Sequence, residues 1–170
     1  PSLATLHTGR NPPQHGVRDG AAHRLDEAEQ TLAETLSELG WRTEAYVGTA
    51  LGAPRWGLNQ GFQTYLLGAQ LDEIKVGSIG SVELVDAVVR THQNERPALV
   101  WVDLPDLRRV QPDSLDHAQA LREVDGAVGA LTEHWWEIHP EGLVVVVGDH
   151  GRSSSHPYTE AFTLQDATLR

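Results

Sequence analysis

The chain has 170 residues and a formal net charge of −11, from 13 Lys and Arg against 24 Asp and Glu. That length allows one domain with a real core, because a domain of this size buries roughly 70% of its unfolded surface. The negative charge argues against nucleic acid or an anionic membrane as a partner, and the absence of cysteine excludes disulfides, zinc–thiolate sites and a cysteine nucleophile within these residues.

Helix-like and strand-like patterns alternate from the start of the chain, which predicts an α/β fold with a sheet between helices. Residues 1–8 predict a short helix that ends at Gly9, because proline fits the first helical turn. Residues 10–20 are dense in turn residues and predict a loop. A helix over 31–39 follows, with a capping box formed by Thr31 and Glu34 and Leu32, Leu36 and Leu39 on one face. Glu44–Val47 then predicts a short strand.

The second half continues the alternation after an irregular, glycine-containing stretch over 51–79. A helix is predicted over Ser81–Val89, and the apolar run Ala98–Val102, which ends at Asp103, predicts a strand buried on both faces. After Pro112, apolar residues recur every three or four positions as far as Trp135 and predict a long helix. Leu143–Val147 is the clearest buried strand in the sequence.

The strongest chemical pattern is Gly-Asp-His-Gly at residues 148–151, directly after this predicted strand. Ligands of open α/β sheets bind beyond the carboxyl ends of the strands, so Asp149 and His150 are candidate metal ligands. A carboxylate beside an imidazole suits Zn²⁺ or Mn²⁺ better than Ca²⁺. An equally good interpretation from spacing alone is a turn that Asp149 merely caps.

Arg10 is a second candidate, because it follows the short first helix and could contact an oxyanion. The competing interpretation, favoured by the residues alone, is that Arg10 pairs with an acidic residue of this acidic chain. His156 lies six residues after His150 and could reach the same site, or it is a plain loop histidine.

The remaining histidines show no pattern that predicts a site. His134 and His139 are five residues apart, so they do not share a helical face, and we predict them at the surface. We predict that His92 and His117 are solvated. No nucleophile elbow, P-loop or dinucleotide fingerprint is present, and no apolar run is long enough to cross a bilayer.

Several segments, in order along nearly the whole chain, resemble the sulfatase family of the alkaline phosphatase superfamily. Residues 1–10, Pro-Ser-Leu-Ala-Thr-Leu-His-Thr-Gly-Arg, and the His-Gly-Val that follows are similar to the sulfatase signature, which reads (Cys or Ser)-x-Pro-Ser-Arg, a short helix, Thr-Gly-Arg and His-Gly-Val. Residues 31–43, 57–65 and 163–170 resemble later family segments, and Gly-Asp-His-Gly resembles its Asp-(His or Asn)-Gly metal motif.

This resemblance implies an alkaline-phosphatase-like, three-layer α/β domain that hydrolyses small anionic sulfate or phosphate esters with a divalent metal, Zn, Mn or Ca. Asp149 and His150 would bind the metal, and Arg10 would help to shape the nucleophile loop. The nucleophile would lie two residues before Pro1, and the first strand would lie earlier still. We therefore expect residues 1–170 to be one partial domain, with exposed strand edges and poor solubility when isolated.

Departures from the family pattern support a second hypothesis. Leu3 stands where the signature has Arg, Asp103 where a substrate-binding His is expected, and Arg152 where an acidic residue is common. The Lys and His that bind sulfate in many members are absent from residues 47–52. The sequence is thus compatible with a hydrolase that is inactive as this piece, or with a non-catalytic binding or scaffold module.

Overall fold

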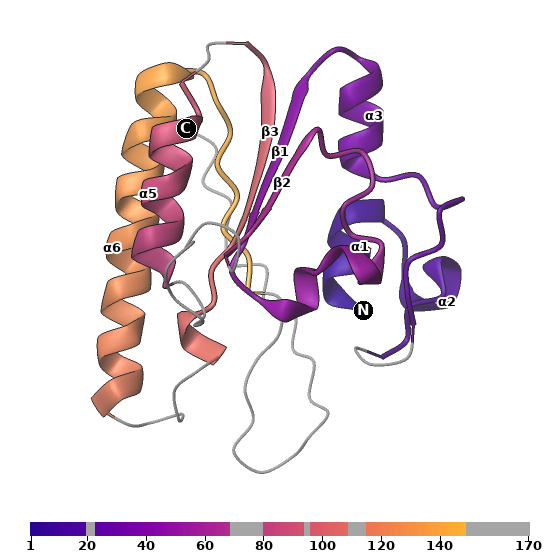
Figure 1. The fold of residues 1–170 in the computed structure, drawn as a ribbon, viewed down its shortest axis with the longest axis horizontal. Helices are drawn as coiled ribbons and strands as arrows, with labels where there is room; N and C mark the ends of the chain where they lie inside the picture. Colours follow the sequence, from indigo (N-terminus) through magenta and orange to yellow (C-terminus); the bar gives the residue numbers. More distant parts are fainter. Residues whose placement is uncertain (20–22, 69–79, 94–95, 109–114, 149–170) are drawn as a thin grey trace.

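The computed structural model describes residues 1–19, 23–68, 80–93, 96–108 and 115–148, which form a parallel sheet with helices on both faces (Figure 1). The helices and strands, in chain order, are α1 (Ser2–Thr8), α2 (Pro12–His15), α3 (Leu32–Glu38), β1 (Arg42–Val47), β2 (Thr64–Leu67), α5 (Ser81–Thr91), β3 (Ala98–Asp103) and α6 (Leu115–Ile138). Three short 3-10 turns lie at Ala50–Gly52, Pro54–Trp56 and Asp106–Arg108. None of the helices in the described ranges is long and apolar enough to cross a membrane.

The three described strands have the order β2-β1-β3, and both pairings are parallel. Glu44 of the central strand lies opposite Thr64 on one side and Val100 on the other. Parallel strands need a crossover between them, and the structure places α5 between β2 and β3 in the chain. All three strands therefore end at the same edge of the sheet.

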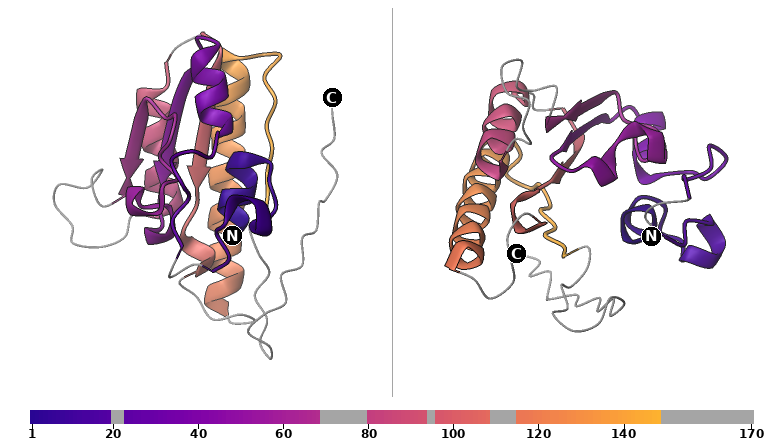
Figure 2. Two further views of the ribbon diagram at one scale, coloured as in Figure 1. Left: turned by 90° about the vertical axis from the view of Figure 1, so that its right-hand side faces the viewer. Right: turned by 60° about the horizontal axis from the view of Figure 1, so that its bottom comes forward.

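The two faces of the sheet are covered by different parts of the chain (Figures 1 and 2). On the α5 and α6 face, Tyr46, Leu84 and Val88 form a buried cluster with partly buried side chains of β3 and α6 around it. On the other face, Ala4 of α1 packs with Leu25 in a second cluster, against which Trp101 of β3 lies. The chain is thus an α/β protein with a small parallel sheet flanked by helices.

Most of the locally encoded elements match their predictions. The helix at the start ends at Gly9, which has φ 65° and ψ 11°, a left-handed conformation that glycine adopts without steric cost. In α3, Thr31 accepts a hydrogen bond from the backbone of Glu34, and the Glu34 side chain reaches back to the backbone of Thr31. The helix after Pro112 and the strand that ends at Asp103 are also found. The predicted burial of this strand on both faces is not, since only Ala98 is buried and the other five residues are partly exposed.

Three predictions were incomplete. The predicted loop over 10–20 contains α2, and the irregular stretch after residue 50 contains β2 and two 3-10 turns. The leucines expected on one face of α3 do not form a buried face, since Leu32 and Leu39 are exposed and Ala33 is the buried residue of that helix. The packing of α3 depends on a small residue, which a search for large apolar side chains does not detect.

The prediction of a buried strand at Leu143–Val147 was wrong for the structure described. These residues have no strand assignment, and Leu143, Val145 and Val146 are more than 60% exposed. Figure 1 shows the segment after α6, in orange, descending toward the edge where the strands end, without joining the sheet. The apolar run has the composition of a buried strand, but burial also needs a neighbouring strand, and none of the described strands pairs with it.

Replacing Gly61 with alanine should strongly destabilise the fold. Gly61 has φ 80°, and a Cβ atom there would overlap the backbone of Ala33 and Glu34. We expect a loss of at least about 1–2 kcal/mol in the free energy of unfolding, measured by urea denaturation. The matched control is Gly126→Ala in α6, where a Cβ meets nothing within 4 Å. That change should stabilise the chain by about 0.5–1 kcal/mol, because alanine favours a helix interior. Equal effects of the two substitutions would contradict this packing of α3.

Candidate functional site

The structure describes only one of the four residues predicted to carry chemistry. Asp149, His150 and His156 lie outside the described residues. Arg10 is described and follows Gly9, the residue at which α1 ends.

Arg10 is held by an acidic partner. Its Nη1 lies 3.1 Å from Oε2 of Glu29, and the Arg10 side chain is 56% exposed. This arrangement matches the interpretation in which Arg10 pairs with an acidic residue of the chain. An exposed pair of this kind contributes at most about 1 kcal/mol, so the guanidinium can exchange Glu29 for another anion at little cost.

The Thr8-Gly9-Arg10 turn is built by local hydrogen bonds. The Thr8 hydroxyl donates to the carbonyl of Ala4 at 2.8 Å and accepts from the backbone N–H of Arg10 at 3.2 Å. An open pocket of about 600 Å³ lies between this turn and the first turn of α3, and Arg10 and Thr31 contribute to its lining. The turn thus presents Arg10 at the rim of a pocket.

His15 joins the two helices at the start of the chain. Its Nδ1 accepts a hydrogen bond from the backbone N–H of Val17 at 3.1 Å, so its Nε2 carries the proton that is donated to the Thr5 hydroxyl at 3.0 Å. Burial lowers the pKa of His15, which favours the neutral form that this geometry needs. His15 therefore has a structural role in holding α2 against α1.

His7 anchors α1 on the sheet. Its ring makes an edge-to-face contact with Trp101 of β3, with 4.3 Å between the ring centroids, and a second such contact with Phe62. Burial lowers the pKa of His7 to about 4, so the ring is neutral at physiological pH. The start of the chain is thereby fixed to the face opposite α5 and α6.

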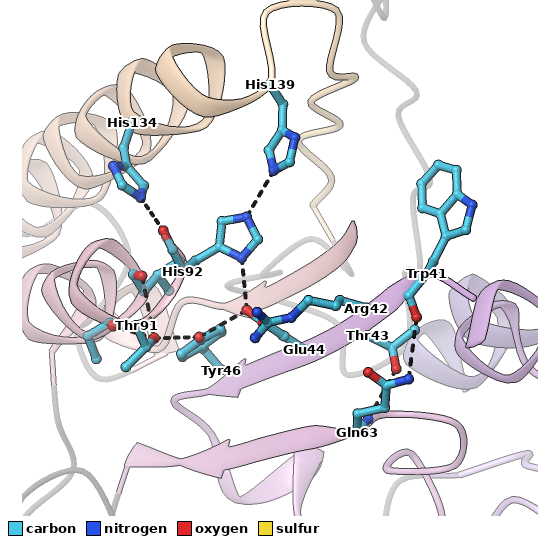
Figure 3. A network of polar contacts seen from close by, with 12 residues as sticks. Trp41, Arg42, Thr43, Glu44, Tyr46, Gln63, Thr91, His92, His134 and His139 are labelled. Carbon is cyan, nitrogen blue, oxygen red and sulfur yellow. Dashed lines mark hydrogen bonds and ion pairs between the residues drawn. The ribbon is translucent and has the colours of Figure 1, made fainter. Parts of the chain in front are cut away.

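The most extensive polar cluster lies on the other face, around Glu44 and His92 (Figure 3). Glu44 is 2% exposed and His92 is fully buried. Nδ1 of His92 lies 3.0 Å from Oε2 of Glu44, and its Nε2 lies 3.0 Å from Nε2 of His139. His134 contributes a further contact, from its Nε2 to the backbone carbonyl of His92 at 2.9 Å. Three imidazoles and one carboxylate therefore meet where α5 ends and α6 ends.

Glu44 is kept ionised by its neighbours. Burial by itself raises the pKa of Glu44, but the hydrogen bond and charge of His92, together with Arg42 and the Tyr46 hydroxyl, outweigh it and lower the pKa. Arg42 forms an ion pair with Oε1, and Tyr46 donates to Oε2 at 3.2 Å. A buried carboxylate is tolerated only when it is paired in this way.

The ionised Glu44 fixes one proton on His92. A carboxylate accepts hydrogen bonds, so Nδ1 of His92 must carry a proton. Nε2 of His92 lies at hydrogen-bond distance from Nε2 of His139, so one of these two nitrogens donates and the other accepts. Glu44, His92 and His139 form a hydrogen-bonded chain that can hold and pass a proton. Trp135 stacks on the ring of His92, with the planes 24° apart, and thereby orients it.

The prediction that His92 is solvated was wrong, because its side chain is fully buried. His134 and His139 are partly exposed, but both also contact His92, which their prediction as surface residues did not include. His92 directly follows α5 and lies four residues after Val88, which itself lies four residues after Leu84, and both are buried. This helical spacing was a usable signal that His92 continues the buried face. The contact with His139, 47 positions later, has no local signal in the sequence.

Asp103 ends β3 at the edge of the sheet where ligands of α/β proteins bind. Its Oδ2 accepts a hydrogen bond from the Thr49 hydroxyl, which follows β1, at 2.5 Å. Its negative charge contributes to raising the pKa of Tyr65, although burial of that phenol is the larger cause. This carboxylate makes its surroundings unfavourable for an anion.

Within the described ranges, no group of three or more His, Asp, Glu or Cys side chains is arranged to hold a metal ion. The His92–His139 pair is also too close for a shared metal, since two Zn–N bonds at a tetrahedral angle separate the nitrogens by about 3.4 Å. The observed Nε2–Nε2 distance of 3.0 Å is that of a hydrogen bond, in which one proton lies between the two nitrogens.

No protein-family model matches the chain, and a comparison with curated proteins finds no significant match. The sulfatase resemblance therefore rests on the residues quoted for it and stays a prediction.

Replacing Glu44 with glutamine should destabilise the chain at neutral pH by about 1–3 kcal/mol, because charge-assisted hydrogen bonds from His92 and Arg42 are lost. The pKa of Glu44 is lowered in the fold, so its stabilising effect is present above the unfolded carboxyl pKa and is lost as the pH falls through the folded value. The difference in unfolding free energy between wild type and Glu44→Gln should thus shrink below about pH 4.

Glu133→Gln is the control for this measurement, because Glu133 is an exposed residue of α6. It should change the unfolding free energy by less than about 0.5 kcal/mol at every pH. If Glu44→Gln is as mild as Glu133→Gln at pH 7, the pairing described for Glu44 is wrong.

Proposed function

We propose that the full-length protein is a metal-dependent hydrolase of small sulfate or phosphate esters, with a sulfatase-like domain to which residues 1–170 belong. The observation that carries the proposal is the geometry of the opening segment. A short helix ends at Gly9 and Arg10 follows, which is the order of the sulfatase-like sequence pattern, and Arg10 contributes to the lining of a pocket.

The position of this segment relative to the sheet supports the proposal further. His7 fixes α1 against Trp101 of β3, so the pocket and the sheet belong to one packed unit. The segment after α6 descends toward the edge where the parallel strands end (Figure 1), and Asp149 and His150 come next in the sequence. The proposal assigns these two residues to the metal and His156 to the same site. When bound, the metal would polarise the ester oxygen and lower the barrier to attack.

The proposal also accounts for the exposed apolar run Leu143–Val147. In a larger sulfatase-like, three-layer sheet, this run would pair with a strand from outside residues 1–170 and would be covered by helices. Its composition suits such a position, because strands that are buried on both faces are continuous apolar runs.

A second function, a non-catalytic sulfatase-like binding or scaffold module, is favoured by one specific observation. Asp103 places a carboxylate at the strand-end edge, hydrogen-bonded by Thr49, where the family pattern has a substrate-binding His. Metal binding separates the two functions, since only the hydrolase requires it.

The hydrolase proposal predicts tight binding of Zn²⁺ or Mn²⁺ by the full-length protein. In calorimetric titrations, Asp149→Ala should weaken this binding more than about 100-fold, because even partners of metal ligands contribute 10–100-fold. The control is Asp125→Asn, which changes an exposed carboxylate of α6 and should leave the affinity unchanged. Failure of the wild type to bind either metal would favour the non-catalytic module.

Residues 1–170 alone should show no measurable turnover of aryl sulfates or aryl phosphates. The proposal assigns the nucleophile to a position two residues before Pro1, and each missing oxyanion-stabilising group costs about 3–4 kcal/mol in the barrier. The assay compares initial rates with those of the heat-denatured chain over a range of substrate concentrations. A saturable rate above the denatured control would show that the catalytic residues have been misassigned.

A further inference from the structure

The contact between His92 and His139 has room for only one proton. The two Nε2 atoms are 3.0 Å apart, a hydrogen-bond distance, so one of them must donate and the other must accept. If both rings were protonated, two N–H groups and two positive charges would face each other across this gap. The folded chain must then separate the two rings.

The two histidines lie at the ends of two packed helices. His92 directly follows α5 and His139 directly follows α6, and these helices pack along one another (Figure 1). Glu44 of β1 holds the fully buried His92 ring from the opposite side, whereas His139 is partly exposed, so separation of the two rings displaces His139 more readily than His92. Figure 3 shows His139 reaching His92 from the end of α6.

We propose that His92 and His139 form a one-proton latch, which joins the end of α6 to the end of α5 at neutral pH and opens when both imidazoles are protonated. Opening frees His139 and the segment that leads from it to Gly148, while His92 stays on Glu44. The inference does not rest on the proposed function, because it uses no residue assigned to the metal or ester site.

The titratable groups whose contacts with the latch the structure describes do not remove this dependence. The hydrogen bond and charge of His92, with Arg42 and the Tyr46 hydroxyl, lower the pKa of Glu44, and burial raises the pKa of Tyr46, so Glu44 stays ionised and the Tyr46 hydroxyl stays protonated at neutral pH. His134 donates its Nε2 proton to the carbonyl of His92 and keeps this donor whether or not its Nδ1 is protonated. Trp135 packs against both rings, and an aromatic face accepts one imidazolium but does not relieve the repulsion between two.

The direction of the pH effect follows from counting protons. In the unlatched state, each imidazole can take up its own proton. The latched pair takes up one proton fewer, so the latched state loses stability as the pH falls. A difference of one bound proton changes the opening equilibrium about tenfold per pH unit.

The test is hydrogen exchange of the full-length protein at several pH values between 8 and 5, corrected for the intrinsic exchange rate at each pH. The reporters are the backbone N–H groups of His139 and Gly142, which donate to Trp135 and His139 in the closed end of α6. In the wild type, their protection should fall by up to about tenfold per pH unit at the acidic end. In His139→Gln, which has no titrating ring, this pH dependence should disappear.

His134→Gln is the matched control, because it changes an imidazole of the same helix that contacts only the backbone carbonyl of His92 among the contacts described. It should keep the full pH dependence of the wild type. The neutral buried rings His7 and His15 are present in all three chains, so their effect on stability cancels in the comparison. Equal pH dependence in wild type and His139→Gln would overturn the latch.

A measurement on the wild type alone keeps the proposal testable if a variant does not fold. Nitrogen-15 NMR of the imidazole rings at pH 8 should find the His92 proton on Nδ1 and the His139 proton on Nε2. Finding His92 protonated only on Nε2, or both Nε2 atoms protonated at pH 5 with unchanged protection of the His139 amide, would show that the contact is not a one-proton latch.

Discussion

The pairing of Glu44 is the interaction on which the α5 and α6 side of the molecule depends. Glu44 lies on β1, the central described strand, and points to the face that α5 covers, where it is almost fully buried. An unpaired carboxylate in that position would cost several kcal/mol, more than a typical single apolar contact returns. Its partners are therefore a condition for packing: Arg42 and Tyr46 come from the same strand, and His92 comes from the end of α5. Helix α5 can therefore pack over Glu44 only if it ends where His92 reaches the carboxylate.

The same requirement extends to α6 through His92. Nδ1 of His92 is hydrogen-bonded to the Glu44 carboxylate. Nε2 of the same ring is buried and needs a second hydrogen-bond partner. His139 supplies that partner, and Trp135, one helical turn earlier, stacks on the ring that the two polar contacts hold. Apolar contacts alone would let two helices slide along each other at small cost, whereas this chain of directed hydrogen bonds is satisfied at one position. The polar network thus sets where the ends of α5 and α6 lie relative to β1.

The sequence predicts well those features whose causes lie within a few residues. The capping box of Thr31 and Glu34 and the left-handed Gly9 involve groups at most four positions apart, and both are found as expected. The long helix after Pro112 carries its period along its whole length. Features that depend on a distant partner were missed or misplaced. The four residues of β2 form a strand because β1 lies beside them, and Leu143–Val147 has every local property of a strand without a described neighbour.

In the candidate site, too, the contacts between distant residues could not be predicted from the sequence. Arg10 and its acidic partner could be anticipated from charge balance, but the choice of Glu29, 19 positions away, could not. The contact between His92 and His139 depends on how α5 and α6 pack. His92, which has no site pattern in the sequence, is buried and hydrogen-bonded through both ring nitrogens. This contact has a further physical consequence. The chain from His139 to Gly148 joins none of the described strands, so no ladder of backbone hydrogen bonds to them distributes its attachment along its length. The contacts near the start of this segment, the His92–His139 pair and the hydrogen bond from Trp136 Nε1 to the Gly142 carbonyl, therefore bear more on its position than they would on that of a strand inside a sheet.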